Sequence, residues 1–158
     1  MLLSACATFP HRGATIVWPQ EINSMEALCD LDMRWKGLKH SGSMSLQVVY
    51  PSRLHFEVYG PFGETLLYVD RQGKDFLLSA QGEKITDAGV FEERFGIKVD
   101  EFMEDIAMRS ARRQGNGASY VQRDGYRVVY RLNDGENTVC WEGPEGTICI
   151  RFIEATFG

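Results

Sequence analysis

In residues 43–59 the sequence reads SMSLQVVYPSRLHFEVY, two runs of alternating apolar and polar residues separated by Pro51-Ser52. Apolar residues at every second position are typical of a β-strand that buries one face. A connection this short joins antiparallel neighbours. The stretch therefore predicts two paired strands with one apolar and one polar face. The apolar face carries Met44, Leu46, Val48, Tyr50, Leu54, Phe56 and Val58.

The same period continues on both sides of this pair and predicts a meander of five antiparallel strands. In the fourth strand two alternations compete, so either Leu66 and Tyr68 or the residues that follow each of them face the core. A short helix is expected before the meander, because Ser24 is a good N-cap for a segment that runs through Leu28. The expected strands are 33–39, 43–50, 53–59, 65–70 and 75–79.

Two short helices are predicted after the meander. Asp87, after Thr86, can cap the first helix, and Gly96 can end it. Asp100 can cap the second helix, whose acidic residues lie opposite an apolar stripe. Four further strands are then expected at 120–122, 126–132, 138–142 and 147–153.

This order of elements predicts the fold class α+β. A single antiparallel sheet of about nine strands tends to curl, and the two helices could cover the opening. We therefore expect a curved antiparallel sheet that forms an incomplete, half-open β-barrel with a helical lid. Residues 14–158 are expected to form this single domain. Side chains can fill such an interior, or it can hold one hydrophobic ligand, and the sequence leaves both alternatives open.

Composition and motifs exclude several classes of function. With 158 residues, 44% of them hydrophobic, and a net charge of −5, the chain has the size of one globular domain and is a poor candidate for binding nucleic acid. We find no nucleophile elbow, phosphate-binding loop, dinucleotide fingerprint or zinc-protease motif. The three histidines are scattered, and no C-x-x-C occurs. We expect no catalysis, no metal and no cofactor.

The amino terminus contains residues typical of a lipid-attachment signal. Leu3-Ser4-Ala5-Cys6 fits the bacterial lipobox, in which the cysteine thiol accepts a lipid. Ala7 follows in place of the aspartate that often signals retention at the inner membrane, which favours the periplasmic face of the outer membrane. Only five residues precede the cysteine, without a basic or long apolar stretch, so we expect the true start upstream. Residues 1–13 are interpreted as signal-peptide remnant, lipobox and tether; the alternative is a chance tetrapeptide.

The other cysteines allow two interpretations. Cys140 and Cys149 flank a strong turn signal at 143–146, so they could form a disulfide across a hairpin. They could equally be two buried thiols on adjacent strands. Cys29 is interpreted as a small core residue.

Several motifs resemble LolB, the family of outer-membrane lipoprotein receptors. They are WKG at 35–37, GPFGETLL at 60–67, KITDA at 84–88, FG at 95–96 and VDEF at 99–102. Together they extend over residues 33–108, roughly half of the chain, and the lipobox agrees with them. The resemblance implies an incomplete barrel around a cavity for acyl chains. It also implies receipt of lipoproteins from a periplasmic LolA-like carrier and their insertion into the outer membrane.

The resemblance also implies roles for individual residues. The loop Pro61, Phe62 and Gly63 matches a family loop whose apolar side chain is important for insertion; the alternative is that Phe62 packs against the sheet. The cavity would bind acyl chains or lipoprotein cargo, although core packing explains the same residues. Other rival functions are a related lipoprotein that binds another lipid, and a structural or assembly lipoprotein that binds an envelope protein. The expected cavity residues are Trp35, Leu46, Val48, Leu54, Phe56, Val58, Leu67, Val69, Phe91, Phe95, Phe102 and Ile106.

Overall fold

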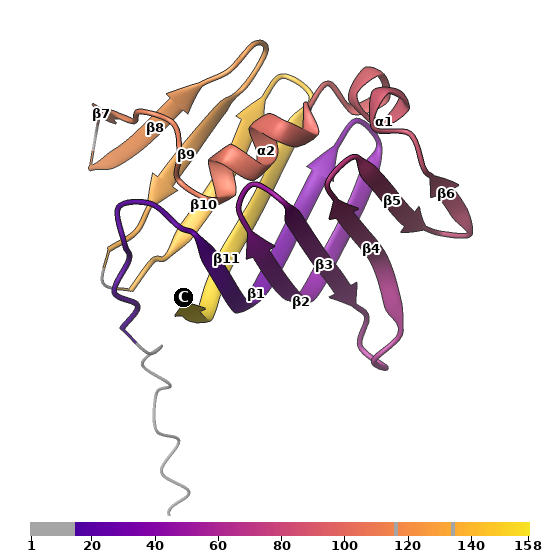
Figure 1. Cartoon of the computed structure of the whole chain (residues 1–158), viewed down its shortest axis with the longest axis horizontal. Coiled ribbons are helices and arrows are strands. Elements are labelled where there is room, and N and C mark those ends of the chain that lie inside the picture. Colours follow the sequence, from indigo (N-terminus) through magenta and orange to yellow (C-terminus); the bar gives the residue numbers. More distant parts are fainter. Residues whose placement is uncertain (1–14, 116, 134) are drawn as a thin grey trace, which may run out of the picture.

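The computed structural model describes residues 15–115, 117–133 and 135–158. Eleven strands form one sheet in which every neighbouring pair is antiparallel. The order across the sheet is β6-β5-β4-β3-β2-β1-β11-β10-β9-β8-β7 (Figure 1). The strands are β1 (Ser24–Trp35), β2 (Leu38–Val49), β3 (Arg53–Tyr59), β4 (Thr65–Gln72), β5 (Asp75–Ala80), β6 (Glu83–Ile85), β7 (Arg113–Gly115), β8 (Ala118–Gln122), β9 (Arg127–Arg131), β10 (Thr138–Gly143) and β11 (Gly146–Phe157).

The sheet is organised around β1, because one edge of this strand pairs with β2 and the other with β11. The β1–β2 hairpin turns at Lys36 and Gly37, whose φ angles are 44° and 82°. Two consecutive positive φ angles match the twist of a tight hairpin and favour glycine at the second position. From β1, one meander extends to β6, and β11 to β7 form the other half of the sheet.

One face of the sheet is apolar. In β1 every second residue from Met25 to Trp35 is buried, whereas Glu26, Asp32 and Arg34 on the opposite face are exposed. The helices α1 (Ala88–Phe95) and α2 (Val99–Ile106) follow β6 and precede β7, which are the two edge strands. They therefore cross the apolar face of the sheet (Figure 1), and the core lies between them and the strands.

The ends of α1 agree with the sequence prediction. The Asp87 side chain accepts hydrogen bonds from the backbone N–H groups of Gly89 at 2.7 Å and Val90 at 3.4 Å. Gly96 has a φ of 71°, and its N–H donates to the carbonyl of Glu92 at 2.8 Å. The predicted cap of α2 is wrong. Lys98 occupies the cap position, and Asp100 lies in the first turn, where a carboxylate favours the helix dipole.

The predicted α+β class is also wrong, and the fold is mainly β. Strands account for 56% of the described residues and helices for 11%. The expected half-open barrel with a helical lid is replaced by one eleven-stranded sheet with two unpaired edges, β6 and β7. The helical share is small because α1 and α2 have only eight residues each, too few to form a helical layer comparable to the sheet.

Three local predictions fail for identifiable reasons. The helix expected at 24–28 is the start of β1, because burial of alternate side chains outweighs the capping preference of Ser24. The strand expected at 33–39 is interrupted by the Lys36-Gly37 turn. The edge strands β6 and β7 are absent from the sequence prediction, since three residues are too few to display a period of two.

The cysteines adopt one of the two expected arrangements. Cys140 and Cys149 face each other across the β10–β11 hairpin and form a disulfide, with their Cα atoms 4.2 Å apart. Cys29 is a buried free thiol on the apolar face of β1. Burial, together with the nearby Asp30 carboxylate, raises the pKa of this thiol to about 12.

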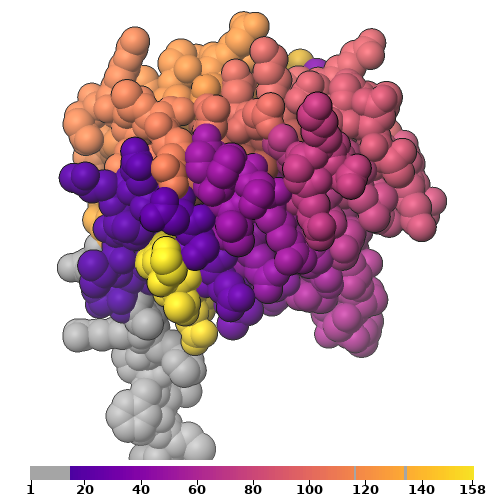
Figure 2. Space-filling model, in the orientation of Figure 1, coloured from indigo at the N-terminus to yellow at the C-terminus, as the bar shows by residue number. Residues whose placement is uncertain are grey.

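The segment before β1 closes one end of the core. Ile22 is buried, and its N–H donates to the carbonyl of Ala107, just after α2, at 3.0 Å. Figure 2 shows the end of β11 beside this segment, and the Gly158 N–H donates to the Ser24 carbonyl at 3.2 Å. Neither helix in the described part of the chain is long and apolar enough to cross a membrane.

Candidate apolar binding site

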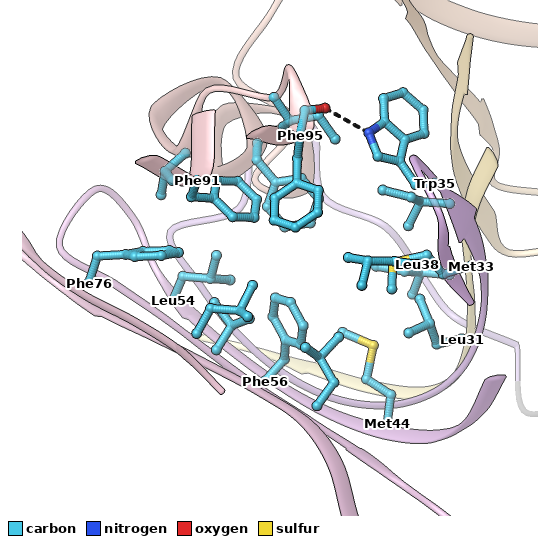
Figure 3. Close-up of a pocket in the computed structure, with 18 residues that line it drawn as sticks. Leu31, Met33, Trp35, Leu38, Met44, Leu54, Phe56, Phe76, Phe91 and Phe95 are labelled. Carbon is cyan, nitrogen blue, oxygen red and sulfur yellow. Dashed lines mark hydrogen bonds between the residues drawn. The ribbon is translucent and has the colours of Figure 1, made fainter. Parts of the chain in front are cut away.

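An apolar pocket lies between the two helices and the apolar face of the sheet (Figure 3). Eighteen residues line it, and all of them are hydrophobic. The space that atoms leave free is about 740 Å³ when the open mouth is included, whereas a sphere the size of a water molecule can move its centre through only about 70 Å³. The pocket is therefore accessible from solvent but narrow.

The apolar wall of the pocket results from the regular spacing of apolar residues within each strand and helix. In β4, Leu67 and Val69 line the pocket, whereas the ring of Tyr68 lies on the opposite face of the sheet beside His55. In α1, Phe91 and Phe95 lie one turn apart, and their ring centroids are 5.0 Å from each other. The Phe91 ring is also 5.3 Å from that of Phe76 in β5, so aromatic contacts join the helix to the sheet across the pocket.

A buried hydrogen bond fixes the carboxyl end of α1. The indole Nε1 of Trp35, at the end of β1, donates to the backbone carbonyl of Phe95 at 2.7 Å, as the dashed line in Figure 3 shows. The ring of Tyr126 packs edge-on against the same indole, with centroids 5.9 Å apart. Because the last carbonyls of a helix have no partner within the helix, this bond satisfies an acceptor that would otherwise be buried without one.

A second polar contact joins α2 to the sheet at the rim of the pocket. The guanidinium of Arg71 in β4 forms an ion pair with Asp100 in the first turn of α2. Its Nη1 also donates to the sulfur of Met103 at 3.3 Å. Val99 and Phe102, which flank this turn, line the pocket. The contact therefore lies at the seam between sheet and helix.

Asp105 anchors the other end of α2 to the sheet. Its carboxylate is fully buried and accepts hydrogen bonds from Arg123 Nε at 3.2 Å and Nη2 at 2.7 Å, and from Trp141 Nε1 at 3.3 Å. The Tyr130 hydroxyl donates to the Asp105 backbone carbonyl at 2.6 Å. Burial raises the pKa of the Asp105 carboxyl to about 6, although Arg123 and Trp141 oppose the shift. The Trp141 ring also stacks on Phe102, with centroids 4.7 Å apart, and so supports one wall of the pocket.

The structure brings eight of the twelve residues expected around an acyl-chain cavity into the wall of this one pocket. They come from strands β1, β3 and β4 and from both helices. They are Trp35, Leu54, Phe56, Leu67, Val69, Phe91, Phe95 and Phe102.

The other four expected residues, Leu46, Val48, Val58 and Ile106, are buried but do not line the pocket. Leu46 and Val48 pair with the first residues of β1, towards the end of the sheet that the segment before β1 closes. Ile106 ends α2 beside Ala107, which bonds to the same segment. Val58 has no exposed surface at all. Packing at these positions fills the space that a wider cavity would need.

Ten residues of the wall are absent from the set of cavity residues expected from the sequence. Eight of them follow the same period of two: four lie in β2 and β5, and the other four lie in β1 and β11, whose full lengths the sequence prediction does not contain. Ile97 and Val99 lie between and at the start of the helices, where no periodic signal exists. The ten are Leu31, Met33, Leu38, Met44, Phe76, Leu78, Ile97, Val99, Ile148 and Ile150.

The loop Pro61, Phe62 and Gly63 lies between β3 and β4, and all three residues are exposed. The Phe62 side chain is 92% exposed, so it does not pack against the sheet. The loop is compact, because the Gly60 N–H donates to the Glu64 carbonyl at 2.8 Å and the Phe62 N–H donates to the Glu64 carboxylate at 2.9 Å. This geometry holds the aromatic ring away from the domain.

Two further predictions concern other parts of the chain. Cys6, the expected lipidation site, lies outside the described residues, as does the whole tether 1–13.

Among residues that the structure describes, no group of three or more histidine, cysteine, aspartate or glutamate side chains is arranged to hold a metal ion. His55 contacts Asp70 and Glu57 at 3.3 Å each on the polar face of the sheet.

Comparison with known proteins adds no assignment. No protein-family model matches the chain, and no curated protein does.

Proposed function

We propose that the protein binds an acyl chain in the pocket between α1, α2 and the sheet, and that its role is binding and not catalysis. The observation that carries this proposal is the lining: all eighteen residues are hydrophobic. A pocket lined by hydrophobic side chains lacks the array of polar partners that a sugar or a nucleotide needs, whereas a hydrocarbon chain needs only apolar contacts.

The energetics suit reversible binding. Each buried methylene group contributes about 0.8 kcal/mol, so roughly ten of them contribute about 8 kcal/mol before any cost. Association offsets part of this gain through lost freedom of motion. The net affinity of a single chain is therefore lower than the buried area alone implies, which suits a protein that passes lipid onward.

Entry of a chain requires α1 or α2 to move away from the sheet. The free space between the atoms of the lining is narrow, and its helix side is lined by Phe91 and Phe95 of α1 and by Phe102 of α2. The restraints described above differ in strength. Trp35 and Asp105 make buried contacts, whereas Asp100 is 77% exposed in its contact with Arg71. We expect the rim at Arg71 to open most readily.

We further propose that this binding serves the receipt or insertion of lipoproteins at the outer membrane, from a LolA-like carrier. The resemblance of residues 33–108 to LolB and the lipobox at Cys6 support this proposal. The exposure of Phe62 supports it too, because an aromatic ring on a tight surface loop can enter the lipid interface.

Filling the pocket tests the proposal. Leu38 lines the pocket, and Leu38→Trp would occupy its free space. Hexadecanol, a neutral single chain, should displace a neutral fluorescent dye from the native protein saturably, and the variant should bind both compounds far more weakly. Lys39→Trp is the matched control, since Lys39 is the next residue of β2 and is exposed.

The control variant should bind like the native protein. No saturable displacement from the native protein would refute acyl-chain binding and favour a structural or assembly protein. Equal loss in both variants would show that the change acts through folding.

A further inference from the structure

We propose that Arg71 is an anion-binding residue at the rim of the apolar pocket, and that the ligand is an acyl chain with a carboxylate or phosphate at one end. The inference rests on one part of the proposed function, the binding of an acyl chain, because it names the ligand class of the same pocket.

The register of the sheet places Arg71 beside the lining of the pocket. Arg71 follows Leu67 and Val69 at intervals of two in β4, and both of these residues line the pocket. Its cross-strand partners are Leu54 in β3 and Phe76 in β5, which line the pocket as well. Since paired residues project from the same face of a sheet, the Arg71 side chain leaves the strand between two pocket residues.

The contacts of Arg71 bring its guanidinium to the seam between the sheet and α2. Its Nε donates to the carbonyl of Gly73 at 3.0 Å, and its Nη1 donates to the sulfur of Met103 at 3.3 Å. The remaining Nη2 pairs with Asp100. The Arg71 side chain is only 16% exposed, so it is held in place at the rim.

Asp100 is a partner that a ligand can replace. Its side chain is 77% exposed, in contrast to that of Arg71. An ion pair with one exposed member contributes little, because water solvates the released carboxylate well. A ligand carboxylate or phosphate can therefore take the place of Asp100 on the guanidinium, whose planar donors match both groups.

The apolar lining explains why the charged group stays at the rim. An ionised group inside the pocket would be buried without a partner, which is strongly unfavourable. With the chain in the pocket and the headgroup at Arg71, the ligand gains both apolar burial and an ion pair. A neutral chain gains only the apolar burial.

Three single-chain probes distinguish these contributions: hexadecanoic acid, hexadecyl phosphate and hexadecanol, each titrated against the dye at about pH 8, where the two acids are ionised. The native protein should bind both anionic probes about tenfold or more tightly than the alcohol, as hydrogen bonds to charged groups imply. Arg71→Gln should abolish this preference, so that the two anionic probes bind no more tightly than hexadecanol.

Asp100→Asn changes the affinity in the opposite direction. It removes a competing carboxylate, so the affinity for the anionic probes should rise about two- to fivefold relative to that for the alcohol. Arg53→Gln is the matched control. Arg53 lies in the adjacent strand β3 and is exposed, and its side chain alternates with that of the pocket residue Leu54.

The outcomes separate this inference from the proposed function. If none of the probes displaces the dye, acyl-chain binding itself fails. If hexadecanol binds but Arg71→Gln does not alter the preference among probes, only the anion-binding role of Arg71 is overturned. A loss confined to the phosphate or to the carboxylate identifies which anionic headgroup the rim recognises.

Discussion

Phe62 is the residue through which we propose that this domain enters a lipid surface. Its ring is 92% exposed on a loop whose hydrogen bonds hold it away from the sheet. Transfer of a phenylalanine side chain from water to an apolar environment contributes roughly 1.5–3 kcal/mol. Phe62→Glu should therefore weaken the binding of the domain to phospholipid vesicles by about tenfold, measured by co-sedimentation.

The folded state should tolerate this change, because the exposed ring makes no buried contact. Val90→Glu is the control, since Val90 is another exposed apolar residue, on α1, and is 51% exposed. Equal vesicle binding by native protein and both variants would rule out insertion through this loop. A lowered unfolding temperature of Phe62→Glu would contradict the exposed position of the ring.

At the scale of elements, Asp105 makes the attachment of α2 depend on pH. The pKa of the buried carboxyl is about 6, against an ordinary value of 3.8, so the folded protein holds this proton more tightly than the unfolded chain. Stability therefore falls as pH rises. Relative to Asp105→Asn, the unfolding free energy of the native protein should decrease by at most about 3 kcal/mol between about pH 4 and pH 6.

Urea denaturation of both proteins across this range measures the difference, in which the titration of shared carboxylates cancels. Arg123, Glu101 and Glu104 are the charged side chains near Asp105, and both proteins contain them. A pH-independent difference would show that the buried carboxyl does not titrate in this range.

The attachment of α1 depends on a different interaction. Trp35→Phe keeps an aromatic ring in the pocket wall but leaves the Phe95 carbonyl without its donor. A buried unsatisfied acceptor costs about 1–3 kcal/mol, so the unfolding free energy should decrease by this amount. Hydrogen exchange in α1 should also become faster, because the restraint at the end of the helix is lost.

Trp18→Phe provides the comparison. The Trp18 indole donates to the Asn137 side chain at 3.0 Å in a partly buried position. Water can replace a partner there, so this variant should lose less stability and leave exchange in α1 unchanged. A similar effect of both variants would argue against a specific role for Trp35.

At the scale of the whole molecule, the sequence predicts what depends on local period and capping. The alternation in residues 43–59 correctly predicts β2 paired with β3, and Asp87 and Gly96 predict the two ends of α1. Eight of the expected cavity residues also meet in one pocket. Each of these results follows from apolar residues spaced by two along a strand or by three to four along a helix, or from a capping residue at a helix end.

What depends on distant partners could not be predicted. Leu46 and Leu54 show the same alternation, yet only Leu54 lines the pocket, because the segment before β1 closes the end of the core near Leu46. Arg71 has no sequence signal, since its position depends on Asp100 and Met103 in α2. The predicted fold class is wrong because residues 24–28 belong to β1 and the edge strands β6 and β7 add to the sheet, and tertiary contacts decide both.

The central place of β1 has a consequence for how the chain is made. During synthesis β1 emerges early and acquires β2 at once, but its other edge waits for β11, more than a hundred residues later, as the pairing of Cys29 with Phe152 shows. Until then a row of unpaired backbone donors and acceptors and an apolar face remain open to other chains. The pair of strands at the middle of the sheet can therefore form only after β11 has been made.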